Sequence, residues 1–194
     1  MNLLAHAVLS PPNPMIFIGN FATDFIRSSE INSLHLDLQV GTALHREIDR
    51  FTDSHHAVLE AKSILVGYQR FANPLVDIFF DHLLTHHWSE AEDLYSFIAN
   101  TYKTIETHRS QLPEPASTIL ADVVSTDWLG KYQSVSGLQL TLQRIERRLN
   151  FRTGRQVALT VSLNFLEQHR GRFESLFLEF WPDLRVHVSS FPIN

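Results

Sequence analysis

Apolar residues recur at intervals of three and four along almost the whole chain, and sustained alternation of apolar and polar residues is nearly absent. This spacing places apolar side chains on one face of an α-helix. Prolines and capping signals, such as the capping box of Ser89 with Glu92, divide the pattern into segments. We therefore predict a short helix before Pro11, helices over Gly19–Arg27, Leu38–Phe51, Ser54–Phe71, Pro74–Trp88, Thr118–Tyr132 and Gly137–Asn150, a helix from Ser89 towards Leu112, and two helical segments between Gly154 and Val188.

One segment leaves a choice between helix and strand. Residues 157–166 are rich in β-branched side chains and alternate briefly, which favours a strand. Charged segments of helical pattern flank this stretch on both sides, so we expect a buried helix there. Because 194 residues fit one compact domain, the pattern predicts an all-α, single-domain helical bundle over residues 1–194.

The composition narrows the possible chemistry. A hydrophobic fraction of 44% and a charged fraction of 19% exclude intrinsic disorder. The chain has no cysteine, which excludes disulfides, thiol nucleophiles and thiolate zinc sites. Any metal must therefore be held by His, Asp or Glu, and eight of the 11 histidines lie within the first 87 residues. No targeting signal and no membrane-spanning run is visible, so we expect a cytoplasmic protein without a membrane partner.

The charge is divided unevenly along the chain. Residues 1–130 carry 16 acidic and 7 basic side chains, whereas residues 131–194 carry 5 acidic and 9 basic ones. Such a basic cluster is either a solvated helix face or a docking surface for an acidic partner. Nucleic-acid binding is disfavoured, because the chain is acidic overall and only Phe151 provides an aromatic ring within the cluster. The cluster consists of Arg144, Arg147, Arg148, Arg152 and Arg155.

Three predicted helices carry polar residues on an otherwise apolar face. In the first of them, Gly19–Arg27, this residue is Asp24. This residue lies between Phe21 and Phe25, and a carboxylate beside a core needs a partner. The alternative is a capping residue or an ion pair with Arg27.

A second helix presents a polar stripe. His45, Asp49 and Asp53 are spaced four residues apart and therefore share one face. One helix could in this way offer a nitrogen and two oxygens to a metal. The alternative is a surface stripe in which Asp49 pairs with Arg46 or Arg50, and for Asp53 we favour a cap of the next helix.

A third, strongly apolar helix is interrupted by two pairs of residues one turn apart. These are Asp77 with Asp81 and His82 with His86, and either pair could bind a metal. Nitrogen and oxygen ligands without sulfur suit Mn²⁺, Mg²⁺, Fe²⁺ or Zn²⁺. The chain has no nucleophile elbow, no phosphate-binding loop and no dinucleotide fingerprint.

Four motifs, in order along the chain, closely resemble the acyl carrier protein phosphodiesterase family. They are Met1-Asn-Leu-Leu-Ala-His, Gly19-Asn-Phe-Ala-Thr-Asp-Phe-Ile-Arg, His45-Arg-Glu-Ile-Asp-Arg-Phe-Thr-Asp and Asp81-His-Leu-Leu-Thr-His-His-Trp-Ser. The resemblance continues more weakly through Trp128-Leu-Gly-Lys-Tyr and Phe180-Trp-Pro. This family is regarded as a divergent branch of the HD-domain metal phosphohydrolases, which implies an HD-domain-like fold.

The resemblance implies an enzyme, a hydrolase that cleaves the phosphodiester between 4′-phosphopantetheine and a serine of holo acyl carrier protein to give the apo form. It implies a divalent cation, preferably Mn²⁺ with Mg²⁺ or Fe²⁺ as alternatives, and the arginine cluster as the docking surface for the acidic carrier protein. Arg46 would neutralise phosphoryl charge, and His86 would protonate the leaving oxygen. The candidate metal ligands are His6, Asp24, His45, Asp49, Asp81 and His82.

The HD-domain analogy would have His45 and the Asp81-His82 pair bracket the ion, with Asp24 or Asp49 completing its coordination. The order of the pair is reversed from the usual His-Asp. Two other functions remain open. One is an HD-type hydrolase of a nucleotide or another small phosphoester, and the other is a metal-free helical module that binds an acidic partner.

Overall fold

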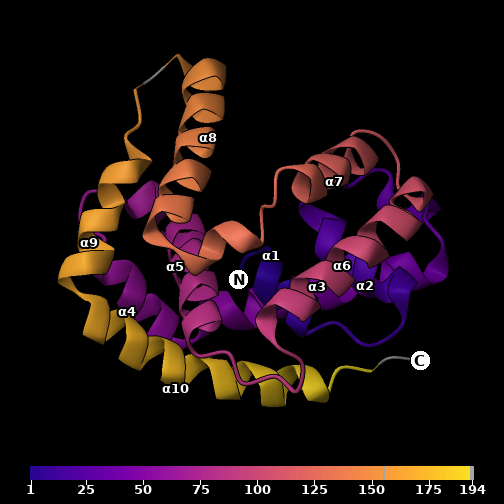
Figure 1. Ribbon diagram of the computed structural model, residues 1–194, viewed down its shortest axis with the longest axis horizontal. Coiled ribbons are helices and arrows are strands. Elements are labelled where there is room, and N and C mark those ends of the chain that lie inside the picture. Colours follow the sequence, from indigo (N-terminus) through magenta and orange to yellow (C-terminus); the bar gives the residue numbers. More distant parts are fainter. Residues whose placement is uncertain (155, 193–194) are drawn as a thin grey trace.

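A computed structural model describes residues 1–154 and 156–192 (Figure 1). Within these residues it consists of helices, turns and loops without a strand, which confirms the predicted all-α class. The α-helices are α1 (Leu3–Val8), α2 (Pro14–Ala22), α3 (Leu36–Ser54), α4 (His56–Ile64), α5 (Ala72–His86), α6 (Leu94–His108), α7 (Ala116–Ser125), α8 (Val135–Thr153), α9 (Leu163–Gln168) and α10 (Arg170–Ser189). Short 3-10 helices are η1 (Thr23–Phe25), η2 (Ile31–Ser33), η3 (Gln69–Phe71), η4 (Arg109–Gln111), η5 (Gly130–Gln133) and η6 (Leu159–Ser162).

The predicted helices exist, but several boundaries are wrong. Residues 157–166 form η6 and the start of α9 rather than a strand. Helix α2 begins at Pro14 instead of Gly19, because the Asn13 side chain accepts hydrogen bonds from two backbone N–H groups of the first turn and proline suits the first helical position. Helix α6 begins after Asp93, whose carboxylate accepts from the N–H of Ser96, so the capping box predicted at residue 89 is not used.

Two predicted helices end early. Helix α4 ends at Ile64, followed by a turn at Gly67 with φ of 88°. Helix α7 ends at Ser125, two residues before Asp127, which has φ of 49°. A positive φ breaks the helical hydrogen-bond pattern, and the periodicity of apolar residues does not reveal it.

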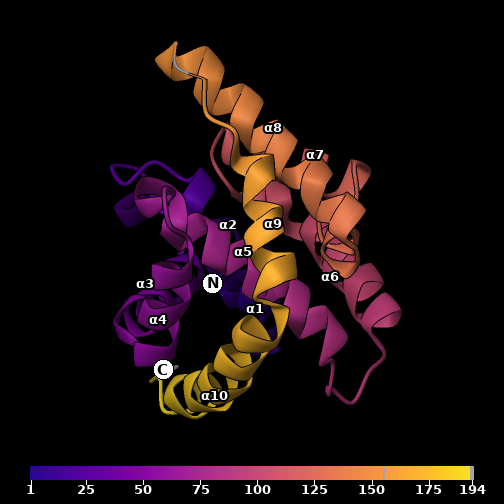
Figure 2. The ribbon, with the colours of Figure 1, turned by 90° about the vertical axis from the view of Figure 1, so that its left-hand side faces the viewer.

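The helices surround the N-terminal segment. Figure 1 shows α1 in the middle of the molecule, with α8 and α9 on one side and α6 and α7 on the other, while α10 runs along one edge. Figure 2 shows that the C-terminal half of α8 extends beyond the neighbouring helices. Within the described ranges, no helix combines the length and hydropathy needed to cross a bilayer.

Helices α2 and α3 pack with their backbones in direct contact. A Cβ atom on Gly19 would lie 2.3 Å from the carbonyl oxygen of Leu38, and one on Gly41 would lie 2.2 Å from the carbonyl oxygen of Ile16. No real Cβ atom approaches backbone so closely, so only glycine permits this packing. The contact fixes the register between the two helices that carry Asn20 and His45.

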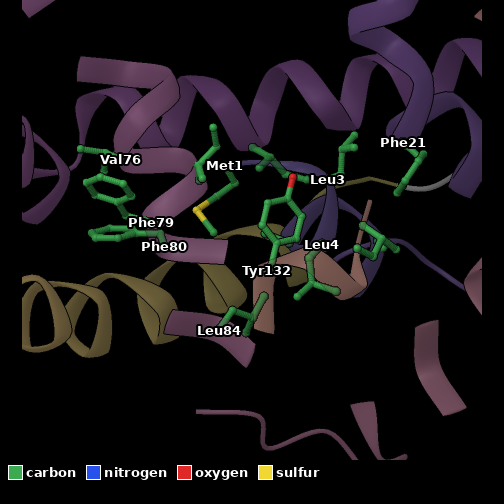
Figure 3. Packing of buried hydrophobic residues seen from close by; sticks show 14 of the residues in the cluster. Met1, Leu3, Leu4, Phe21, Val76, Phe79, Phe80, Leu84 and Tyr132 are labelled. Carbon is green, nitrogen blue, oxygen red and sulfur yellow. The ribbon is translucent and has the colours of Figure 1, made fainter. Parts of the chain in front are cut away.

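Helix α1 is fastened by a buried carboxylate from α5. The Asp81 oxygens accept hydrogen bonds from the backbone N–H groups of Leu4 at 2.8 Å and Ala5 at 3.3 Å. The Asn2 side chain accepts from the hydroxyl of Tyr132 at 2.8 Å, and Figure 3 shows the Tyr132 ring close to Leu3 and Leu4. These bonds satisfy N–H groups that the first turn of a helix leaves unpaired. Burial raises the pKa of Asp81 to about 7, although the two N–H groups act in the opposite direction.

We expect Gly41→Ala to lower the free energy of unfolding by about 3 kcal/mol or to prevent folding, because the added methyl group overlaps backbone that cannot move independently. Urea denaturation followed by circular dichroism measures this. Gly171→Ala in α10 is the matched control, since a Cβ there meets no atom within 4 Å. That variant should be unchanged or more stable by up to about 1 kcal/mol. Equal stability of the two variants would contradict the prediction.

Candidate functional site

Two buried histidines from different helices meet face to face. His6 comes from α1 and His45 from α3, and their rings stack with centroids 4.0 Å apart and an interplanar angle of 12°. Asp49 lies one turn beyond His45, and Asp24 lies in η1 at the opening of the site. We call these four residues the histidine–aspartate cluster.

Asn20, in α2, orients both rings. His6 Nδ1 donates to the side-chain oxygen of Asn20 at 2.9 Å, and His45 Nδ1 donates to its backbone oxygen at 2.7 Å. With the proton on Nδ1, each neutral ring carries its lone pair on Nε2. The Asn20 amide in turn donates to the backbone oxygen of His6 and to Ser10 Oγ, both at 2.9 Å. One buried residue thus sets the direction of both histidines, through its side chain for His6 and through its backbone oxygen for His45.

The two Nε2 atoms converge on carboxylates. His6 Nε2 lies 3.3 Å from Asp49 Oδ1, and His45 Nε2 lies 3.1 Å from Asp49 Oδ2. Both nitrogens are buried, and neither makes an aligned hydrogen bond. One potential ligand atom from each of His6, His45 and Asp49 lies within 4.8 Å of the other two. Two imidazole nitrogens and a carboxylate oxygen at such spacing can hold a divalent cation.

The electrostatics of the cluster are unequal. Burial and the neighbouring His45 lower the pKa of His6. Burial also favours the neutral form of His45, but Asp24 and Asp49 outweigh it and raise the pKa of His45 to about 9. Burial raises the pKa of Asp49, but the two histidines outweigh it and hold that pKa well below its ordinary range. Without a cation, the cluster therefore holds a proton on His45 at neutral pH.

Asp24 connects the cluster to a cleft. Its Oδ1 lies 3.3 Å from His45 Nε2, and its side chain is 70% exposed. Its interaction with His45 lowers the pKa of Asp24, so the carboxylate is ionised at neutral pH. The cleft, of about 230 Å³, is lined by residues of η1, η5 and α8 as well as by Asn2 and Leu3. We call it the α8 cleft.

The structure separates the Asp81-His82 pair from the cluster, which corrects the expectation that this pair brackets an ion with His45. Both Asp81 oxygens accept hydrogen bonds from backbone N–H groups of α1. His82 Nδ1 donates to the backbone oxygen of Tyr132 at 2.6 Å, and the side chain lines a second cavity that also contains Arg170. Successive residues of a helix point about 100° apart, so neighbouring positions on α5 face different partners.

The two predicted catalytic residues outside the cluster also lie elsewhere. His86 is exposed at the end of α5, where its ring contacts that of His82 with centroids 4.5 Å apart. Arg46 is exposed and, among the described residues, forms no ion pair and does not line the α8 cleft. Asp53 binds Lys62 at 2.8 Å and Asn73 at 2.9 Å rather than capping α4, so the polar stripe on α3 contributes only two residues to the site.

A sequence model of the family described as acyl carrier protein phosphodiesterase matches residues 1–184. The chain belongs to the acyl carrier protein phosphodiesterase family. This confirms the resemblance carried by the four motifs and the prediction of a phosphodiester hydrolase.

Individual members of the family match nearly the whole chain. The acyl carrier protein phosphodiesterase of Photorhabdus laumondii subsp. laumondii is 31% identical over 186 residues, covering 94% of this chain and 92% of the relative. That of Pectobacterium atrosepticum is 30% identical over 186 residues, covering 94% of each chain. That of Escherichia coli O157:H7 is 28% identical over 193 residues, covering 97% of this chain and 98% of the relative. No solved structure matches the chain.

Asn20 was not predicted from the sequence to be part of the site. The available signal was a single amide within the apolar run of α2, where a buried polar side chain requires hydrogen-bond partners. Nor was it predicted that Trp128 and Lys131 line the α8 cleft. Nothing in the helical period relates these positions to Asp24, because they come together only through the packing of η5 and the residues before it against α5 and α8.

The predicted arginine cluster divides into different environments. Arg144 forms an ion pair with Asp122 and stacks its guanidinium over the Trp128 ring, 3.8 Å from the centroid. Arg148 is exposed and lines the cleft. Arg147 and Arg152 are exposed on the projecting half of α8. Arg155 lies outside the described residues.

The raised pKa of His45 predicts how stability depends on pH in protein stripped of cations with EDTA. The folded state keeps the proton until about pH 9, whereas an unfolded histidine releases it near pH 6.5. The contribution of His45 to the free energy of unfolding should therefore fall as pH rises from about 6.5 to about 9, by at most about 1.4 kcal/mol per pH unit. Urea titrations at several pH values measure this slope.

His45→Gln should reduce the slope of the free energy of unfolding against pH, because it removes the imidazole that binds the proton. Asp49→Asn should also reduce it, because Asp49 is one of the carboxylates that raise the pKa of His45. His169→Gln, at an exposed histidine of the loop before α10, should leave the slope unchanged. The same slope in wild type and His45→Gln would contradict the assignment.

Proposed function

We propose that this protein is a metal-dependent phosphodiesterase that removes 4′-phosphopantetheine from holo acyl carrier protein and yields the apo form. The observation that carries the proposal is the convergence of two buried imidazole nitrogens, neither in an aligned hydrogen bond, and a carboxylate beside a cleft lined by cationic side chains. Family membership supports the choice of substrate, because the relatives are named for acyl carrier protein.

The donor set fits a divalent cation. Buried polar atoms in proteins are normally paired, yet His6 Nε2 and His45 Nε2 have no hydrogen-bond partner. We assign His6, His45 and Asp49 as the residues that would hold the cation, and Asn20 as the residue that orients the two imidazoles. Nitrogen and oxygen donors suit Mn²⁺, with Mg²⁺ or Fe²⁺ as alternatives. Bound there, the cation supplies a Lewis acid that favours hydroxide formation and offsets phosphoryl charge.

Asp24 is suited to accept a proton. Its carboxylate is ionised, exposed, and placed where the cluster opens into the α8 cleft. In the proposed reaction Asp24 takes a proton from the attacking water, whose oxygen bonds to phosphorus. The bond from phosphorus to the serine oxygen then breaks, that oxygen takes up a proton from water, and the exposed Asp24 releases its proton to water.

Lys131 and Arg148 are suited to bind the phosphodiester. Both line the α8 cleft, and among the described residues neither forms an ion pair. Their charges are therefore available for phosphoryl oxygens, which they would stabilise through charge-assisted hydrogen bonds. They take the role that the sequence assigned to Arg46.

The carrier protein would dock on the projecting half of α8. Arg147 and Arg152 are exposed there beside Phe151, which is 92% exposed. A positive surface with an exposed aromatic ring is complementary to an acidic protein, and along α8 it is next to the cleft-lining residue Arg148. Arg144 is already bound to Asp122 and Trp128, so we leave it out of this docking surface.

Mass spectrometry of holo acyl carrier protein incubated with the purified protein and Mn²⁺ tests the reaction. We expect the carrier to lose the mass of phosphopantetheine and EDTA to prevent this loss. Asp49→Asn should slow turnover by at least about 100-fold, because it removes a charged ligand.

Asp53→Asn is the matched control, one turn further along α3, and should retain turnover because Asp53 binds Lys62 and Asn73 outside the cluster. Unchanged holo carrier in the wild-type reaction would refute the proposed function. Equal turnover of the two variants would refute the metal assignment.

For docking, we expect Arg147→Glu with Arg152→Glu to raise the KM for holo carrier protein about tenfold at low salt with little change in kcat, because steering is lost while the cluster is intact. The effect should shrink as added salt screens the charges. Arg70→Glu with Arg170→Glu changes the net charge equally at exposed positions of other elements, and its KM should stay near wild type. Equal KM values for both double variants would reject this docking surface.

A further inference from the structure

The α8 cleft has different chemistry along its length. At the end nearest the cluster lies Asp24, and the cations Lys131 and Arg148 also face the cleft. Much of the remaining wall is apolar and includes Leu3, Leu140 and Ile145. A ligand that matches this lining combines a phosphate with a mainly uncharged chain.

We propose that the α8 cleft binds the pantetheine arm of the substrate, with its phosphate near Asp24 and its chain along α8. This inference rests on the proposed function and adds to it the subsite that recognises the prosthetic group. The carrier protein itself would remain outside, on the docking surface defined above.

One face of α8 forms the inner wall. The residues that line the cleft are Leu140, Thr141, Arg144, Ile145, Arg148 and Leu149. They occur as adjacent pairs at four-residue intervals, which is a single stripe on a helix. Arg147 and Phe151 do not line the cleft, and both are exposed. The lining of the cleft therefore ends at Leu149, and the residues of the docking surface stay outside it.

The size of the cleft favours a slender ligand. Its volume of about 230 Å³ is below the range of about 300–1,000 Å³ that encloses drug-sized molecules. A helix of a partner protein, about 10 Å across, does not fit such a space. A narrow chain can occupy this space in part, with the rest of the arm outside it, and a phosphate at one end would meet the cations.

Polar groups in the lining match the amides of the arm. The Asn2 side-chain oxygen already accepts from Leu3 N–H and from the Tyr132 hydroxyl, so its amide NH₂ group is left to donate to a carbonyl. The Thr141 hydroxyl donates to the Gly137 backbone oxygen and keeps lone pairs that can accept an amide N–H. Both residues line the cleft.

The aromatic residues argue against a nucleotide. Stacking a base requires a free ring face, but Arg144 covers one face of Trp128 at 3.8 Å from the centroid. Phe25 meets Trp128 at an interplanar angle of 88° with centroids 6.3 Å apart. Tyr132 is buried, with its hydroxyl bonded to Asn2. The cleft thus offers side walls for a chain rather than a slot for a planar base.

Calorimetry with free 4′-phosphopantetheine and with pantetheine, which lacks the phosphate, tests the subsite in Mn²⁺-loaded protein. Leu140→Trp fills the cleft, and we expect it to weaken binding of both compounds at least about tenfold and to raise the KM for holo carrier protein. Arg148→Gln should weaken binding of 4′-phosphopantetheine alone. Adenosine 5′-monophosphate should compete poorly.

Leu178→Trp in α10 is the matched control, because Leu178 is 49% exposed and Leu140 is 53% exposed. It should bind both compounds like wild type. Unchanged affinities in Leu140→Trp, or stronger binding of the nucleotide than of 4′-phosphopantetheine, would overturn the inference. Turnover of holo carrier by Leu140→Trp with wild-type KM would also overturn it. Failure of wild type to produce apo carrier would instead refute the proposed function, while the binding measurements would still decide whether the cleft recognises the arm.

Discussion

The close approach of α2 and α3 is the constraint on which the candidate site depends. Gly19 and Gly41 allow each helix to touch the backbone of the other, at a separation that any Cβ atom would prevent. Because of this contact, the backbone oxygen of Asn20 lies 2.7 Å from the ring nitrogen of His45. A wider separation of the two helices would leave a buried donor unpaired and free the ring to rotate.

The second histidine is positioned by a separate chain of contacts. Asp81 of α5 accepts hydrogen bonds from the first N–H groups of α1, and α1 places His6 against the side chain of Asn20, whose backbone oxygen holds His45. A buried carboxylate is unfavourable unless it accepts hydrogen bonds, and here it receives them from the helix that it fastens. Asp81 therefore matters for the site without lying in the cluster. Two independent packing contacts thus meet at Asn20.

The two histidines of the cluster are buried, whereas Asp24 is exposed, and the difference has physical consequences. His6 and His45 are buried, which keeps both rings in fixed orientations with their Nε2 atoms directed at the carboxylates and outside any aligned hydrogen bond. Asp24 is exposed, so its interactions are partly screened and its carboxylate can exchange protons with water. Helix α8 then supplies cations and apolar walls on one face. The combination gives a rigid inner cluster with an open, charged approach.

The sequence alone determined the all-α class and the position of most helices. It also singled out three of the four residues of the histidine–aspartate cluster, namely His45, Asp49 and Asp24. Their side chains follow from a local period and from the apolar neighbours of each polar residue. His6 was reached only through the resemblance to the family. The HD-domain-like arrangement stays a prediction, because no observation compares the two folds.

Tertiary structure alone decided which polar residues share a site. Asp81, His82 and His86 interrupt one apolar helix in the same way as His45 and Asp49 interrupt another, so periodicity gives all of them equal weight. The difference arises from what packs against each helix. Backbone N–H groups of α1 donate hydrogen bonds to both oxygens of Asp81, and the backbone oxygen of Tyr132 accepts one from the ring of His82. Asn20 has no local signal of its role beyond being polar in an apolar run. Its four hydrogen bonds join residues up to 25 positions apart, and only the packed helices bring those atoms within reach.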